Sequence, residues 1–135
     1  MCIKPKKVKE EMFSDAEIYQ KMLDCFPNHG FENMERYYGI KEAEIIFFAT
    51  DGKFVFREQF YDICTKILKC SLEEINQFRK AMITFKKREV EKIRLLFSWR
   101  LGDEGEKLFD YLDKRIIYVV AKSYVVEQLF LDFAI

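Results

Sequence analysis

The strongest constraint on this fold is a helical apolar period that begins just after residue 58. Apolar side chains at i, i+3, i+4, i+7 and i+8 share one face of an α-helix: Phe60, Ile63, Cys64, Ile67 and Leu68. Ser71 and Glu74 follow with the spacing of a capping box, which indicates the start of a second helix. A basic helix is expected over 86–100, and residues 106–135 keep helical spacing. The pattern therefore predicts a mainly α-helical fold.

The domain boundaries follow from the polar start of the chain. Pro5 and several lysines discourage a packed N-terminus, so residues 1–12 are expected to be a polar tail. Ser14 and Glu17 have capping-box spacing and indicate the first helix. Half of the 135 residues are hydrophobic, enough for one sizeable core. We expect a single helical domain over residues 13–135.

One segment has a β-type pattern. The apolar run 45–48 precedes the turn pair Asp51-Gly52, and the apolar run 54–56 follows it. This predicts a β-hairpin, and a helix that ends at Gly52 is the alternative. Residues 116–120 are rich in β-branched side chains and could form a strand instead of continuing a helix. The fold class is thus mainly α, with at most one short hairpin near residues 45–56.

Charge is balanced overall but unevenly distributed. The chain has 23 basic and 23 acidic residues. Residues 63–100 contain 10 basic and 4 acidic residues, whereas residues 10–62 contain 5 basic and 12 acidic residues. A basic middle segment could bind phosphate or an acidic partner. The alternative is that it packs against its own acidic flanks.

Signals for a cofactor, a metal or catalysis are absent from the sequence. There is no Gly-rich phosphate loop and no Gly-x-Ser-x-Gly motif, so we expect no cofactor and no enzyme activity. The four cysteines include no CxxC pair, and the spacing of Cys25, His29, Cys64 and Cys70 fits no usual zinc site. No signal peptide or membrane span is recognised, which predicts a cytoplasmic protein with free thiols.

Two stretches resemble a known family. Residues 52–59 read GKFVFREQ; residues 70–74 read CSLEE; residues 78–82 read FRKAM, and a basic run continues to Phe97. Residues 108–114 read LFDYLDK and are followed by Tyr118 and Lys122-Ser123. In this order and spacing they resemble the fingers region of C-family replicative DNA polymerases, the catalytic alpha subunit of bacterial DNA polymerase III.

The departures from the family pattern limit what the resemblance implies. Arg57 stands where the family usually has Gln, and Ala121 and Tyr124 stand where it has Asn and His. The family's catalytic aspartates belong to a palm domain that these 135 residues do not contain. Two-metal phosphoryl transfer requires such carboxylates. The resemblance therefore implies a fingers module without an active site.

The resemblance also implies a set of phosphate-binding residues. Five basic residues match basic family positions: Arg79, Lys80, Lys86, Lys87 and Lys122. If one helix persists through Thr84, Arg79 and Lys86, and likewise Lys80 and Lys87, are two turns apart on one face. Such a face could neutralise nucleic-acid phosphates. The alternative is a solvated helix face with no ligand.

Two hypotheses follow. The first is a polymerase-derived, non-catalytic module that binds DNA or a replication protein; a phage or another mobile element is a source that it suggests. The second is a small helical protein–protein interaction module or homodimer with no nucleic-acid role, because 14 Phe and 7 Tyr residues offer apolar anchors.

Overall fold

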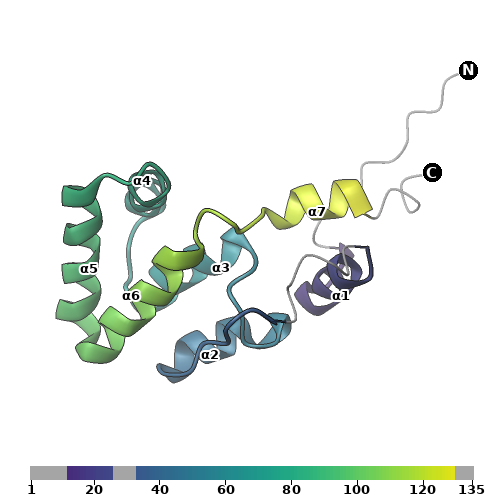
Figure 1. The fold of residues 1–135 in the computed structure, drawn as a ribbon, viewed down its shortest axis with the longest axis horizontal. Helices are drawn as coiled ribbons and strands as arrows, with labels where there is room; N and C mark the ends of the chain where they lie inside the picture. Colours follow the sequence, from purple (N-terminus) through teal and green to yellow (C-terminus); the bar gives the residue numbers. More distant parts are fainter. Residues whose placement is uncertain (1–11, 26–32, 130–135) are drawn as a thin grey trace, which may run out of the picture.

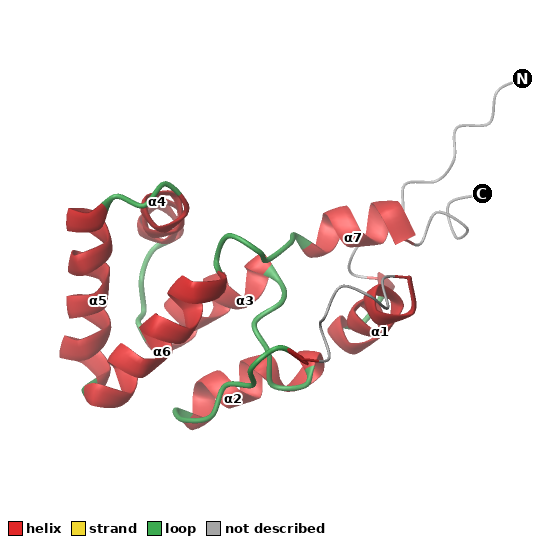
Figure 2. Cartoon of the chain, viewed as in Figure 1, coloured by secondary structure: helices red, strands yellow, loops and turns green. Residues whose placement is uncertain are grey.

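The computed structural model describes residues 12–25 and 33–129, and this part of the chain is helical without a β-strand (Figures 1 and 2). Its α-helices are α1 (Asp15–Cys25), α2 (Lys41–Phe47), α3 (Arg57–Asp62), α4 (Leu72–Ile83), α5 (Lys87–Leu101), α6 (Asp103–Arg115) and α7 (Lys122–Leu129). A short 3-10 helix, η3 (Phe48–Thr50), extends α2, and a π-helical segment, η4 (Ile63–Ile67), extends α3. The mainly helical prediction is confirmed. None of these helices has the length and apolar character needed to cross a bilayer.

Both predicted capping boxes are present. The backbone N–H of Ser14 donates to Glu17 at 3.1 Å, and that of Ser71 donates to Glu74 at 3.0 Å. The serine hydroxyls accept from the glutamate amides, each at 3.2 Å. The backbone hydrogen bond from each serine lowers the pKa of its glutamate. Local sequence signals therefore determine where α1 and α4 begin.

The apolar side chains form two clusters at different places along the molecule. The larger cluster joins α2, α3, α4, α5 and α6, and includes Phe47, Phe60 and Phe97. The smaller one joins α1 to α7. Figure 1 shows α1 and α7 together at one end and α4 and α5 together at the other. The extended segment 53–56 connects the clusters, because Phe54 belongs to the larger and Val55 and Phe56 belong to the smaller.

The predicted hairpin near residues 45–56 does not form. Its first half is α2 and η3, and the chain then turns at Asp51 and Gly52, both with positive φ. The alternative, a helix that ends at Gly52, describes this segment better. Phe56 makes an isolated parallel bridge with Val120, and the proposed strand at 116–120 contributes no more than this bridge.

Side chains replace the missing strand partner of segment 53–56. The Gln59 Oε1 atom accepts the backbone N–H groups of Val55 at 2.8 Å and Phe56 at 2.9 Å. The Tyr111 hydroxyl accepts from the Phe54 N–H at 3.0 Å, and Arg115 Nε donates to the Phe54 carbonyl at 3.0 Å. Buried backbone groups need partners, and here α3 and α6 provide them. A hairpin would have to break these bonds.

We predict that Gln59→Met destabilises the protein by about 2–6 kcal/mol. The substitution keeps the side-chain volume but leaves two buried N–H groups without an acceptor, each costing about 1–3 kcal/mol. Urea denaturation measures the change in free energy of unfolding. Gln77→Met on the exposed face of α4 is the matched control and should change it by less than about 0.5 kcal/mol. Equal effects of the two substitutions would contradict the role assigned to Gln59.

Candidate nucleic-acid interface

Helix α4 positions two of the predicted basic residues. It is held in place by the buried side chains of Ile75, Ala81 and Met82. Arg79 is half-buried beside this apolar face, and Lys80, one position later, is exposed. The two residues therefore leave the helix in different directions, about 100° apart.

The end of α4 changes the expected spacing of the basic residues. The Lys86 N–H donates to the Ala81 carbonyl at 3.1 Å and the Phe85 N–H to the Met82 carbonyl at 3.4 Å, the pair of bonds of a Schellman motif. Phe85 is left-handed with φ 56°, so the helix stops before it. The condition that one helix persists through Thr84 is not met, and Lys86 and Lys87 lie at a corner instead of two turns along the same helix.

Three lysines occupy this corner between α4 and α5: Lys80, Lys86 and Lys87. All three side chains are exposed, and none forms an ion pair with a residue that the structure describes. Their charges are therefore available to an external anion. We call this set the lysine corner.

Arg79 lines a pocket that the sequence did not predict. The pocket has a volume of about 340 Å³ and is lined by Arg57, Arg79, Ile83, Ile116, Ile117 and Val119. No acidic residue is among these residues. The Arg79 Nε atom is buried and has no hydrogen-bond partner within the described chain. A buried guanidinium donor without an acceptor is costly, and an anion in the pocket would supply one.

Lys122 is not brought to the lysine corner. Its ammonium is 2.9 Å from the Asp15 carboxylate, and its backbone N–H donates to the Glu58 carboxylate at 3.0–3.1 Å. It thus connects α7 to α1 and α3. In Figure 1, α1 and α7 lie at the opposite end from α4 and α5.

Sequence reasoning missed two residues near this surface. Arg57 was noted only as a departure from a family pattern, and nothing in its spacing to Arg79 indicates a shared pocket. Phe85 stands at a helix end, where the left-handed conformation favours Gly. An apolar residue directly before Lys86-Lys87 was the signal that could have drawn attention to it.

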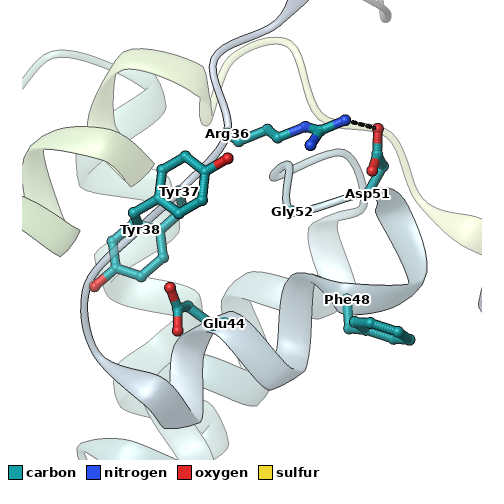
Figure 3. Close-up of a pocket in the computed structure, with 7 residues that line it drawn as sticks. All are labelled: Arg36, Tyr37, Tyr38, Glu44, Phe48, Asp51 and Gly52. Atoms are coloured by element: carbon teal, nitrogen blue, oxygen red, sulfur yellow. Dashed lines mark hydrogen bonds and ion pairs between the residues drawn. The ribbon is translucent and has the colours of Figure 1, made fainter.

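A second pocket lies between α2 and the segment before it, and its only cation, Arg36, is already paired. Arg36 and Asp51, on two sides of this pocket of about 220 Å³, are joined at 2.8 Å. The Glu44 carboxylate accepts from the Gly39 N–H at 3.4 Å. Figure 3 shows Arg36 reaching Asp51, while Phe48 points away from both. The pair of Arg36 and Asp51 joins the segment before α2 to the turn at Gly52, and the pocket keeps the negative charge of Glu44.

The cysteines give no sign of a zinc site. Cys64 is buried, Cys70 is half-buried and Cys25 is exposed, and all three are free thiols. His29 and Cys2 lie outside the described residues, so the four-ligand set with His29 is not placed. Within residues 12–25 and 33–129, no three His, Cys, Asp or Glu residues are grouped to hold a metal ion.

The comparisons with known proteins give one match. Residues 14–104, well over half of the chain, match the family model described as the bacterial DNA polymerase III alpha subunit finger domain. No curated protein and no solved structure matches. The match includes Arg57, Arg79 and the lysine corner but ends before Lys122.

We predict that Cys64 reacts with iodoacetamide only when the protein unfolds. Burial raises the pKa of the Cys64 thiol and excludes the reagent, whereas Cys25 is exposed and serves as the internal control. The free energy of unfolding should fall as the pH rises above the ordinary thiol pKa, because in that range Cys64 ionises in the unfolded chain and not in the folded one. Peptide mass spectrometry measures both sites. Similar alkylation rates at Cys25 and Cys64 in the native protein would contradict this.

Proposed function

We propose that this chain is a non-catalytic module that binds nucleic acid through its phosphates. It belongs to the finger-domain family of the bacterial DNA polymerase III alpha subunit. The observation that carries the proposal is the pocket that Arg57 and Arg79 both line, with no acidic residue in its lining. Two guanidinium groups provide forked donors that match phosphate oxygens.

The lysine corner extends this surface. Lys80 directly follows Arg79, and Lys86 and Lys87 follow the end of the same helix. Exposed, unpaired lysines release counterions from a phosphate backbone without reading its sequence. The proposed interface therefore consists of Arg57, Arg79 and the lysine corner. Lys122 is left out because Asp15 already neutralises it.

We propose further that the chain does not extend a primer by itself and acts in the cytoplasm on DNA or on a replication complex. The family's catalytic carboxylates belong to a palm domain, and positioning phosphates without those metal ligands does not give phosphoryl transfer. A primer-extension assay with magnesium and the purified chain tests this. Incorporation of a nucleotide would disprove it.

A second candidate function is self-association or protein binding through α5. Its outward face, opposite the buried Phe97, presents Arg88, Lys92, Leu95 and Trp99. Trp99 is 79% exposed and Leu95 is 56% exposed. Sedimentation at several concentrations tests for a dimer, and loss of that dimer in Leu95→Ser with Trp99→Ser would favour this function over the first.

We predict that Arg57→Gln with Arg79→Gln weakens binding to duplex DNA and single-stranded DNA alike. Each lost phosphate contact lowers the slope of log affinity against log salt by about 0.9 on duplex DNA and about 0.7 on a single strand, so two contacts give about 1.4–1.8. Replacing Arg79 and all three lysines by Ser should remove a slope of roughly 3–4 on duplex DNA. Fluorescence anisotropy over a salt series measures both.

The control for the arginine-pair variant also removes two positive charges, but at positions outside the proposed interface. Arg36→Gln with Lys107→Gln removes two cations that are already paired with Asp51 and Glu104. This variant should keep the wild-type slope. The proposed interface is overturned if wild type does not bind DNA at low salt. It is also overturned if affinity falls equally in the arginine-pair variant and in this control.

A further inference from the structure

Phe85 is placed where a helix end favours glycine. It is the left-handed residue of the Schellman motif that closes α4, with φ 56°. Glycine is the usual residue there because a Cβ atom is unfavourable in this conformation. A bulky aromatic side chain at such a position is uncommon and calls for a reason beyond the turn itself.

Packing does not supply that reason. The Phe85 side chain is 70% exposed, so most of its ring is in water. It lines a shallow pocket of about 200 Å³ together with Met82, Lys87, Val90 and Asp113. Next along the chain are Lys86 and Lys87 of the lysine corner. The ring is thus an exposed apolar surface beside unpaired cations.

We propose that Phe85 is a stacking platform for an unpaired base of a single-stranded nucleic acid. This rests on the proposed phosphate binding at the lysine corner and deepens it by naming the form of nucleic acid. An aromatic ring stacks on the face of a base, and lysines beside it hold the phosphates that flank that base. A base within a duplex has no free face, so this contact favours single strands.

The pocket beside Phe85 fits a base better than a phosphate. Met82 and Val90 give it apolar walls, and Asp113 contributes a carboxylate that repels phosphate. The same carboxylate accepts hydrogen bonds, as from an exocyclic amino group. The base therefore lies over the ring and the pocket, and the backbone phosphates lie beside Lys86 and Lys87, the second of which also lines the pocket.

The test is Phe85→Gly, a change that the turn favours. The variant should fold with an unchanged or higher Tm because glycine suits φ 56°. Its affinity for a single-stranded oligonucleotide should fall by about 5- to 100-fold, the range for the loss of one stacked base. Its affinity for duplex DNA should stay within about twofold, since the lysines and arginines remain.

Two control variants show whether a ring at this site is the cause. Phe85→Tyr keeps the ring and should bind single strands like wild type. Trp99→Ser removes an exposed aromatic residue near the other end of α5, where the Arg100 guanidinium lies 5.5 Å from its ring centroid, and should leave single-strand binding unchanged. Phe85→Trp with Trp99→Phe has tryptophan only at position 85, and a single strand should quench its fluorescence.

The outcomes separate this inference from the proposed function. If Phe85→Gly binds a single strand as tightly as wild type does, with the same salt dependence, the stacking platform alone is overturned. Equal losses on single-stranded and duplex DNA, or a marked loss of Tm, would also overturn it, because the side chain would then support the corner structurally. Absence of binding by wild type to either form would overturn both proposals.

Discussion

The buried amide of Gln59 is the interaction on which the arrangement of this molecule depends. Its oxygen holds segment 53–56 extended by accepting two backbone N–H groups, and its nitrogen donates to the Thr50 hydroxyl at 2.7 Å. This orientation puts Phe54 into one apolar cluster and Val55 and Phe56 into the other. The Arg57 N–H then donates to the Val120 carbonyl at 2.9 Å. The Gln59 side chain and the Val120 carbonyl therefore fix the backbone around Arg57, which lines a pocket with Arg79.

Some basic residues of this molecule are neutralised by carboxylates, and others are not. Arg36, Arg94 and Lys122 pair with carboxylates from other parts of the chain and tie neighbouring elements together. Others form no ion pair within the described chain, and these include Arg57, Arg79 and the lysine corner. A folded domain with balanced total charge thus keeps a locally unneutralised surface. Net charge alone could not reveal that surface, because it adds both groups together.

Sequence predicted the features that depend on local chemistry. The capping boxes at Ser14 and Ser71 form between residues within one turn of each other. The apolar face that begins at Phe60 is likewise set by the spacing of residues within a few turns. The hairpin prediction was wrong because residues 54–56 are bonded by Gln59 and Tyr111, and Tyr111 is more than fifty residues away in sequence. Such tertiary partners cannot be read from an alternating apolar pattern. The pocket of Arg57 and Arg79 was missed for the same reason.

Two local choices in the second half of α4 and just after it are unfavourable for folding alone. Arg79 keeps a buried Nε atom without an acceptor, and six residues later Phe85 keeps a side chain in a left-handed conformation. Each costs on the order of 1–2 kcal/mol, and glycine in place of Phe85 would relieve the second without disturbing the turn. Sequences that fold well are usually consistent at every level, and departures concentrate where a ligand must be met. Both departures border the unpaired cations, which is where the proposed interface would meet an anionic strand.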